Sequence, residues 1–146
     1  MSIQKLNPYL VFNGDAQQAI DLYERVLGAR TEFVQRFGEI PDVSPDPASK
    51  DRIIHALLRI GGDAVMVSDS QPDHQVPAGA TVQVCLDFSD PDDMRSRFDA
   101  LGAGGSIDMP LHDTFWGATF GMLTDPHGIH WMFNCQKAPA PSAAAK

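Results

Sequence analysis

The pattern of hydrophobic and polar residues divides the chain into the same series of elements twice. In the first half, short apolar runs bounded by Gly, Pro and Asn predict four strands, at residues 6–12, 31–37, 53–60 and 64–67. In the second half, the same kind of pattern predicts four more, at residues 81–88, 107–109, 115–123 and 129–135. A helix is predicted between the first and second strand of each half.

The first helix is marked at both ends. Its apolar residues recur at helical spacing from Ala16 to Leu27. Asp15 lies directly before this stretch and Gln18 lies three residues after Asp15, which is the pattern of a capping box. Gly28 follows the stretch and predicts a left-handed residue that ends the helix.

The second helix carries matching signals. Asp90 is its predicted N-cap, and Pro91 suits the first helical position. Its apolar stripe is formed by Met94, Phe98 and Leu101. Gly102 is predicted to end it, and both helices finish in the same Leu-Gly-Ala tripeptide. The chain is therefore an internal repeat of about 75 residues.

This repeat predicts an α+β fold in which two βαβββ modules form a curved mixed sheet with a concave cleft. We predict a single domain over residues 1–137, with modules at residues 1–69 and 80–137 joined by a linker at residues 70–79. The tail at residues 138–146 is rich in Ala and Pro and is predicted to be disordered.

Composition narrows the classes of function. Hydrophobic residues make up 43% of the chain and charged residues 21%, which is typical of a soluble globular domain. The net charge is −8 and the Lys and Arg residues are scattered, which argues against a nucleic-acid partner. The chain shows neither a membrane-helix run nor a secretion-signal pattern, so we expect no membrane partner and a cytoplasmic location. Cys85 and Cys135 lie in apolar runs and are expected to be free, buried thiols.

Strand alternation predicts which side chains line the cleft. His55 and Arg59 share one face of the third predicted strand, and Gln83 lies on the polar face of the fifth. Phe12 and Met132 are expected to form an apolar floor. The cleft thus combines apolar and polar groups, which is typical of a site for a small organic molecule.

Several of these residues have a structural and a functional interpretation. His55 is either a pocket histidine hydrogen-bonded to a neighbour or a general base or ligand-binding group, because its pKa lies near neutrality. Arg59 either binds a ligand carboxylate or phosphonate or pairs with an internal acid such as Asp87. His130 is either structural or acts beside His55 in the site.

Two further segments have alternative interpretations. Phe115 and Trp116 precede the seventh predicted strand, and are either core or dimer-contact residues or an aromatic wall for a flat ligand. The Pro-rich segment at residues 39–51 is either a lid over the cleft or a plain surface loop.

Four stretches in order along the chain resemble the vicinal-oxygen-chelate superfamily, which includes glyoxalase I, ring-cleaving dioxygenases and bleomycin-resistance proteins. They are PYLVFNGDAQQAIDLYERVLGA from Pro8, FGEIP from Phe37, HALLRIGGDAVMVSD from His55, and FWGATFGMLTDPHGIHWMFN from Phe115. The last stretch most resembles the PhnB-like branch. The resemblance implies paired βαβββ modules that form a cleft, and a homodimer.

The resemblance also implies positions for a divalent metal. They correspond here to Pro8 (with Asn7 beside it), His55, Gln83 and Met132. Of these, His55 alone is a good ligand for zinc, nickel or iron. We therefore expect no metal site and no cofactor.

Three functions follow as hypotheses. The first is a PhnB-like protein that binds a small organic molecule in its cleft without a metal. The alternative is a lyase or isomerase that acts on a small carbonyl or phosphonate compound, with His55 as general base. The third is an interaction module whose cleft is vestigial. Some PhnB-like relatives carry a ubiquinone methyltransferase label, but the chain lacks the glycine-rich nucleotide loop that a Rossmann-type methyltransferase uses.

Overall fold

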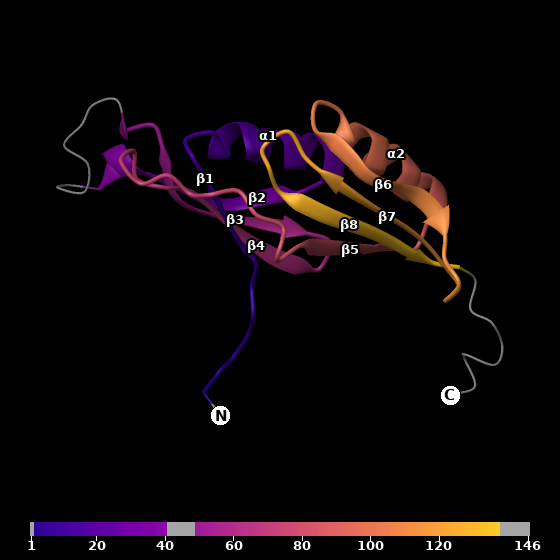
Figure 1. Cartoon of the computed structure of the whole chain (residues 1–146). Coiled ribbons are helices and arrows are strands. Elements are labelled where there is room, and N and C mark those ends of the chain that lie inside the picture. Colours follow the sequence, from indigo (N-terminus) through magenta and orange to yellow (C-terminus); the bar gives the residue numbers. More distant parts are fainter. Residues whose placement is uncertain (1, 41–48, 138–146) are drawn as a thin grey trace. The chain divides into compact units, whose positions relative to one another are not determined.

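The computed structural model describes residues 2–40 and 49–137, and the chain divides into two compact units. Unit 1 spans Met1–Ala78 and unit 2 spans Gly79–Lys146. Each unit has one strand, one helix and then three strands, as the internal repeat predicts (Figure 1). The predicted α+β fold with two βαβββ modules is therefore confirmed.

Unit 1 forms a mixed four-stranded sheet with one helix. Its elements are β1 (Tyr9–Phe12), α1 (Ala16–Leu27), β2 (Arg30–Arg36), the 3-10 turn η1 (Phe37–Glu39), β3 (Ile53–Ile60) and β4 (Asp63–Asp69). The strand order is β1-β4-β3-β2, in which β1 and β4 are parallel and the other neighbours are antiparallel. Parallel pairing needs a long crossover, which α1, β2 and β3 supply.

Unit 2 repeats this topology. Its elements are β5 (Val84–Phe88), α2 (Pro91–Gly102), β6 (Ser106–Asp113), β7 (Ala118–Thr124) and β8 (His130–Gln136). The strand order is β5-β8-β7-β6, again with one parallel pair, β5 and β8. β8 of unit 2 therefore corresponds to β4 of unit 1, and β7 corresponds to β3.

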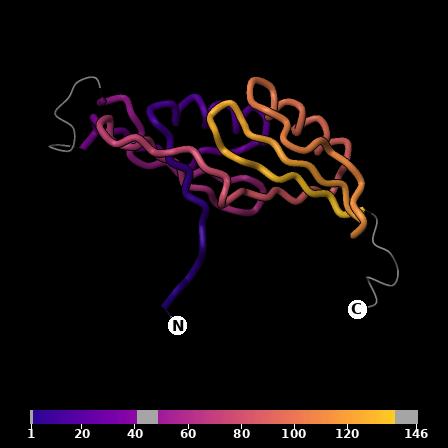
Figure 2. The backbone as a smooth tube through the Cα atoms, in the orientation of Figure 1, coloured from indigo at the N-terminus to yellow at the C-terminus, as the bar shows by residue number. Residues whose placement is uncertain are grey.

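In unit 1, α1 covers one face of the sheet (Figures 1 and 2). The side chains buried beneath it include Leu10, Phe12, Ala56, Leu58, Val65 and Val67. We call the opposite face of this sheet, which includes Tyr9 and Val11, the helix-free face of unit 1. Phe12 is only 2% exposed, so the prediction that it forms the floor of the cleft is wrong. Alternation along β1 directs Tyr9 and Val11, rather than Phe12, to the helix-free face.

In unit 2, α2 covers one face of the sheet in the same way (Figure 1). Its apolar stripe of Met94, Phe98 and Leu101 is buried against β7 and β8. The Phe98 ring meets the Phe133 ring edge-on, with centroids 5.1 Å apart. The other face, which carries Met122 and Met132, is the helix-free face of unit 2.

The two helices begin in different ways. At α2, the Asp90 carboxylate accepts a hydrogen bond from the Asp92 amide at 3.0 Å, as predicted. At α1, Asp15 makes no side-chain cap hydrogen bond, so the predicted capping box is wrong. Asp69 at the end of β4 takes that role, and its Oδ1 accepts from the Gly14 and Ala16 amides at 2.9 Å each.

The helix ends also differ from one another. Gly28 is left-handed, with φ of 68°, and ends α1 as predicted. Gly102 is instead the last residue of α2, and the left-handed residue is Gly104, with φ of 85°. A Cβ at position 102 would lie 2.5 Å from the terminal methyl carbon of Ile107, so a larger residue there would require the Ile107 side chain to move.

The strand predicted at residues 115–123 is shorter in the structure, where it is β7 (Ala118–Thr124). The strand before it, predicted at residues 107–109, is longer than predicted. β6 continues to Asp113, and Thr114 to Gly117 form a tight turn before β7. The Thr114 amide donates to the Ala118 carbonyl at 2.8 Å, and Gly117 has a φ of 85°. Phe115 and Trp116 therefore lie at the tip of a hairpin. The first and fifth strands also start later than predicted, at Tyr9 and Val84.

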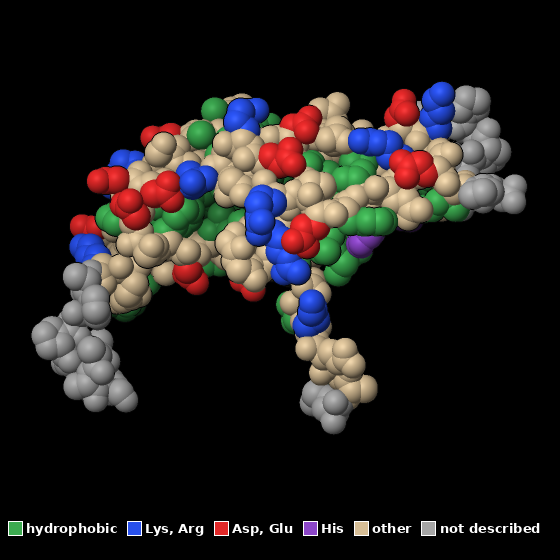
Figure 3. All heavy atoms as spheres, turned by 180° about the vertical axis from the view of Figure 1, so that it is seen from behind, with side chains coloured by type: hydrophobic (Ala, Val, Ile, Leu, Met, Phe, Trp, Pro, Cys, Tyr) green, Lys and Arg blue, Asp and Glu red, His purple; other side chains and the backbone are tan. Residues whose placement is uncertain are grey.

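Two predicted segments fall in parts of the chain that are not described. These are the tail at residues 138–146 and residues 41–48 of the loop at 39–51. Among the helices that the structure describes, none is long and apolar enough to cross a membrane. Figure 3 shows Lys and Arg side chains interspersed with Asp and Glu side chains on the face that it displays.

Candidate functional site

His55 lies among aromatic side chains on the helix-free face of unit 1. Its Nδ1 is 3.1 Å from the Tyr9 hydroxyl. Its ring centroid lies 5.8 Å from that of Tyr9 and 5.9 Å from that of Phe33, with both rings tilted against it. Tyr9 and Phe33 are 45% and 47% exposed, so this cluster presents apolar ring surface around the hydrogen-bonded Tyr9 hydroxyl and His55 imidazole. We call it the Tyr9–His55–Phe33 cluster.

Strand register explains why these three side chains meet. Phe33, Leu57, Met66 and Tyr9 are successive partners across β2, β3, β4 and β1. His55 pairs with Gln35 two residues further along β3, and Tyr9 reaches it from two strands away. Because paired residues point to the same face of a sheet, Leu57 and Met66 form an apolar floor between the aromatic rings.

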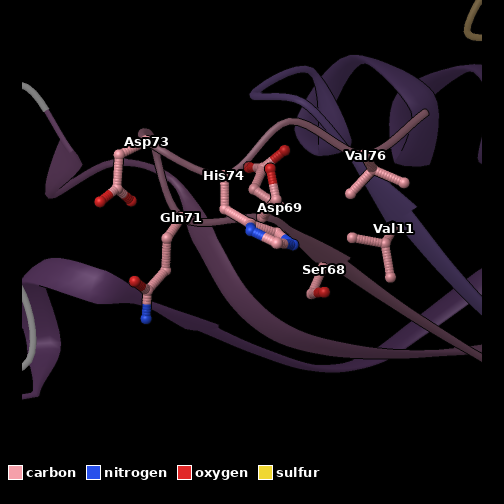
Figure 4. Close-up of a pocket in the computed structure, with 8 residues that line it drawn as sticks. Val11, Ser68, Asp69, Gln71, Asp73, His74 and Val76 are labelled. Atoms are coloured by element: carbon pink, nitrogen blue, oxygen red, sulfur yellow. The ribbon is translucent and has the colours of Figure 1, made fainter.

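A hollow of about 600 Å³ adjoins this face at the end of β4 (Figure 4). It is lined by Val11, Ser68, Asp69, Ser70, Gln71, Asp73, His74 and Val76. Val11 and Ser68 are partners on the helix-free face, so the hollow continues from that face toward the segment after β4. The Asn13 amide holds this segment by accepting from the Val76 amide at 2.7 Å and donating to the Val76 carbonyl at 3.0 Å.

Arg59 pairs with an acid of its own chain, as one of its two interpretations has it, but that acid is Glu32 and not Asp87. Arg59 Nε donates to Glu32 Oε1 at 3.1 Å, and both side chains are about one third exposed or more. Glu32 lies on β2, within the register shift between Thr31 and Phe33 that directs its side chain toward Arg59. The positive charge of Arg59 is thus compensated by Glu32 rather than by Asp87.

The helix-free face of unit 2 carries a row of sulfur-containing side chains. Met109, Met122, Met132 and Cys85 are successive partners across β6, β7, β8 and β5. We call these four residues the sulfur row. Next to it, Asn134 donates from Nδ2 to Asp87 Oδ1 at 3.0 Å. On its other side lie His130 and Thr124, whose side chains contact each other at 2.9 Å.

The remaining predicted residues lie at the margins of unit 2. Gln83 directly precedes β5, and its Nε2 donates to the Ala80 carbonyl at 3.2 Å. Phe115 is 97% exposed and Trp116 is 51% exposed, so within the chain they are not core residues. The two rings meet edge-on at 5.0 Å, and Trp116 also lies 6.0 Å from the Phe120 ring.

The sequence pattern does not single out Tyr9, Phe33 or Thr124 as site residues. Tyr9 and Phe33 were part of predicted apolar strands, but a strand pattern does not show which rings lie beside His55. The sequence signal for Thr124 was its position opposite His130 across the turn at residues 125–128. In an antiparallel hairpin closed by the turn at residues 125–128, Thr124 and His130 are paired and their side chains lie on the same face of the sheet.

Both cysteines are free thiols, but they differ in exposure. Cys135 is buried as predicted, whereas Cys85 is exposed, because β5 turns it away from α2. Partial burial, followed by the nearby Asp87 carboxylate, raises the pKa of the Cys85 thiol. A higher pKa leaves less thiolate near neutral pH, and thiolate is the reactive form.

We therefore expect Cys85 to react with iodoacetamide more slowly near neutral pH than an unperturbed thiol. Asp87→Asn should raise the rate about twofold, because it removes the smaller of the two causes of the raised pKa. Peptide mass spectrometry over time measures the rate at Cys85 separately from Cys135. Asp99→Asn on α2 is the matched control. Equal rates for the two variants would contradict the role of Asp87.

The fold defines a class: proteins of two βαβββ units, each of which forms a four-stranded mixed sheet with a helix on one face. The sequence profile of one family matches residues 5–133 of the chain. The chain belongs to the Glyoxalase/Bleomycin resistance protein/Dioxygenase superfamily.

Individual relatives agree with this assignment. The chain is 36% identical over 141 residues to protein YjdN of Escherichia coli (strain K12), covering 90% of this chain and 95% of that protein. The chain also matches the crystal structure of protein PA1353 from Pseudomonas aeruginosa, with 38% sequence identity and a TM-score of 0.83. The match covers 93% of this chain and 100% of the PA1353 chain. The structure of a PhnB protein from Bacillus cereus matches 90% of this chain and 99% of its own chain, with a TM-score of 0.76. The sequence identity is 23%, so this match supports the fold alone.

Residues of this chain do not fit the divalent metal that the superfamily resemblance implies. Pro8 has no side-chain donor atom, and a thioether such as Met132 is a poor ligand for zinc, nickel or iron. The topology also shows that His55 and Met132 are not equivalent positions of the two units. The residue of unit 1 that corresponds to Met132 on β8 is Met66 on β4, whereas His55 lies on β3. Within residues 2–40 and 49–137, no group of three or more His, Cys, Asp or Glu side chains is placed to hold a metal ion.

Proposed function

We propose that the protein binds a small, uncharged organic molecule with a planar carbonyl group on the helix-free face of unit 1, without a metal. The observation that carries this proposal is the Tyr9–His55–Phe33 cluster. It combines ring surfaces with a hydrogen-bonded hydroxyl and imidazole over the apolar floor of Leu57 and Met66. Such a surface is typical of sites for small organic molecules.

The Tyr9 hydroxyl supports a donor role for His55. A phenol donates a hydrogen bond better than it accepts one, because its oxygen lone pair is delocalised into the ring. If Tyr9 donates to Nδ1 of His55, the neutral imidazole carries its proton on Nε2. That N–H is suited to a carbonyl oxygen of the ligand.

The charge around the cluster supports an uncharged ligand. Arg59 is the cation on this part of β3, and its charge is compensated by Glu32. The net charge of −8 further disfavours an anionic molecule at long range. These two features favour a carbonyl compound over a phosphonate.

The experiment uses protein labelled with ¹³C at the methionine methyl groups and titrated with acetophenone as the probe. The methyl signal of Met66 should shift and saturate, while that of buried Met94 in α2 stays in place. His55→Ala should weaken acetophenone binding about tenfold, because the hydrogen bond to the carbonyl oxygen and the contact with the imidazole ring are both lost. His112→Ala, an exposed histidine on β6, is the matched control and should bind as the wild type does.

Two results would overturn this proposal. One is a Met66 signal that does not respond to acetophenone, and the other is equal affinity in His55→Ala and the wild type. Elemental analysis of protein purified without chelator tests the metal-free part, and stoichiometric zinc, nickel or iron would contradict it.

A lyase or isomerase with His55 as general base is the second candidate. It is favoured by the position of His55 within reach of a ligand on the apolar floor. It requires the opposite hydrogen bond, in which Nδ1 donates to Tyr9 and Nε2 is left to accept a proton. Consumption of a carbonyl compound by the wild type and not by His55→Ala would favour this function over simple binding.

A further inference from the structure

The hollow at the end of β4 is walled by a segment that lies outside the strands of both units. This segment runs from residue 70 to residue 76, between β4 and β5, and we call it the strap. Val11 and Ser68 line the hollow from the sheet, and His74 and Val76 are among the strap residues that line it (Figure 4). All lining residues belong to unit 1, and none of them belongs to the Tyr9–His55–Phe33 cluster or to its floor.

The strap is held at both of its ends by Asn13. Asn13 Oδ1 accepts from Ser70 Oγ at 3.3 Å and from the Val76 amide at 2.7 Å, and Nδ2 donates to the Val76 carbonyl at 3.0 Å. Arg52 also donates to the Ser70 carbonyl, from Nε at 3.1 Å and from its guanidinium NH2 group at 2.6 Å. Hydrogen bonds thus fix the wall of the hollow, which is typical of a preformed site for a small molecule.

The Ser68 hydroxyl is a polar group that opens into this hollow. Ser68 is 8% exposed, and within the described part of the chain its hydroxyl has no hydrogen-bond partner. Every fully buried side-chain nitrogen or oxygen of the described residues does have a partner. Ser68 Oγ is therefore not fully buried, and the surface left to it faces the hollow that Ser68 lines. Since a hydroxyl both accepts and donates, this oxygen can accept a hydrogen bond from a molecule in the hollow.

The charges around the hollow favour a cation. Asp69 and Asp73 are among its lining residues, and no Lys or Arg of the described chain is. The Asp69 carboxylate already accepts from three backbone amides, so it contributes negative charge rather than a new contact. Arg52 is bound to the Ser70 carbonyl and does not line the hollow. Two carboxylates without a lining cation attract a positively charged molecule and repel an anion.

From these observations we propose that the hollow under the strap binds a small primary amine in its ammonium form. The ammonium group donates a hydrogen bond to Ser68 Oγ, and a short alkyl chain lies against Val11 and Val76. Asp73 attracts the charge through space. The site differs from the one proposed on the helix-free face of unit 1 in its residues and in the charge of its ligand, and it does not rest on that function.

The first test titrates the full chain, labelled with ¹³C at the valine methyl groups, with n-butylamine. The signals of Val11 and Val76 should shift and saturate, while that of Val65, buried beneath α1, stays in place. Butyrate has a similar chain and the opposite charge, and should give no saturating shift. No response of Val11 and Val76 to n-butylamine, or an equal response to butyrate, would overturn the proposal.

The second test uses variants of the two groups that recognise the ammonium ion. Ser68→Ala should weaken n-butylamine binding about fivefold, because the acceptor oxygen is lost. Asp73→Asn should weaken it about twofold and reduce its dependence on salt, because an exposed charge is removed. Ser96→Ala, an exposed serine on α2, is the matched control and should bind as the wild type does. Equal affinity in Ser68→Ala and the wild type would overturn the proposal.

The two labels separate this inference from the function proposed for unit 1. A response of Met66 to acetophenone, with no response of Val76 to n-butylamine, would overturn the amine site and leave the proposed function standing. A response of Val76 to n-butylamine, with no response of Met66 to acetophenone, would support the amine site and overturn the proposed function.

Discussion

Replacing Asp69 with Ala is expected to lower the free energy of unfolding by about 3–5 kcal/mol. The carboxylate is 5% exposed and accepts three backbone hydrogen bonds. Two come from Gly14 and Ala16 at the start of α1, and the third comes from Ile53 at the start of β3. Ala would leave these three amides without their acceptor, each at a cost of about 1–3 kcal/mol before the structure relaxes.

Urea denaturation followed by circular dichroism measures this change. Asp73→Ala is the matched control, because Asp73 is exposed, and it should change stability by no more than about 0.5 kcal/mol. Asp69→Asn keeps one acceptor oxygen and should have an intermediate effect, which remains measurable if the Ala variant does not fold. A loss below about 1 kcal/mol in Asp69→Ala would contradict the role given to this carboxylate.

Replacing Gly105 with Ala is expected to lower the free energy of unfolding by about 3 kcal/mol or more. A Cβ at this position would lie 2.0 Å from the Thr124 carbonyl oxygen and 2.8 Å from the Asp125 carbonyl carbon. Both atoms are backbone at the end of β7, so neither can move aside without disturbing the pairing of β6 with β7. The glycine is therefore required by close approach of two segments.

Gly62→Ala is the matched control for this variant. A Cβ at Gly62, in the turn between β3 and β4, would meet no atom within 4 Å. Its stability should stay within about 0.5 kcal/mol of the wild type. Thermal unfolding of both variants gives the comparison, and similar melting temperatures for Gly105→Ala and Gly62→Ala would show that the contact at Gly105 relaxes cheaply.

The candidate site was partly predictable from the sequence. Alternation placed His55 and Arg59 on the same face of one strand, and the structure has them there. It could not give the partners of either residue. Tyr9 lies 46 residues from His55 and Glu32 lies 27 residues from Arg59, so both contacts depend on which strands pair and in which register.

Phe12 shows how sensitive such predictions are to strand phase. The first strand was predicted to begin at residue 6, and its apolar residues did not establish which face meets the helix. β1 has only four residues, and its parallel pairing with β4 sets Leu10 and Phe12 beneath α1. A shift of one residue would exchange the two faces completely.

The sequence by itself determined the doubled βαβββ order, the positions of both helices and the cap at Asp90. These features depend on periodicity and on residues within a few positions of each other, which local physics controls. Tertiary structure alone decided that Asp69 rather than Asp15 caps α1, that Glu32 rather than Asp87 pairs with Arg59, and that Tyr9 meets His55. Each of these contacts joins residues from different strands or from a strand and a helix, and its energy exists only once the sheet register brings them together.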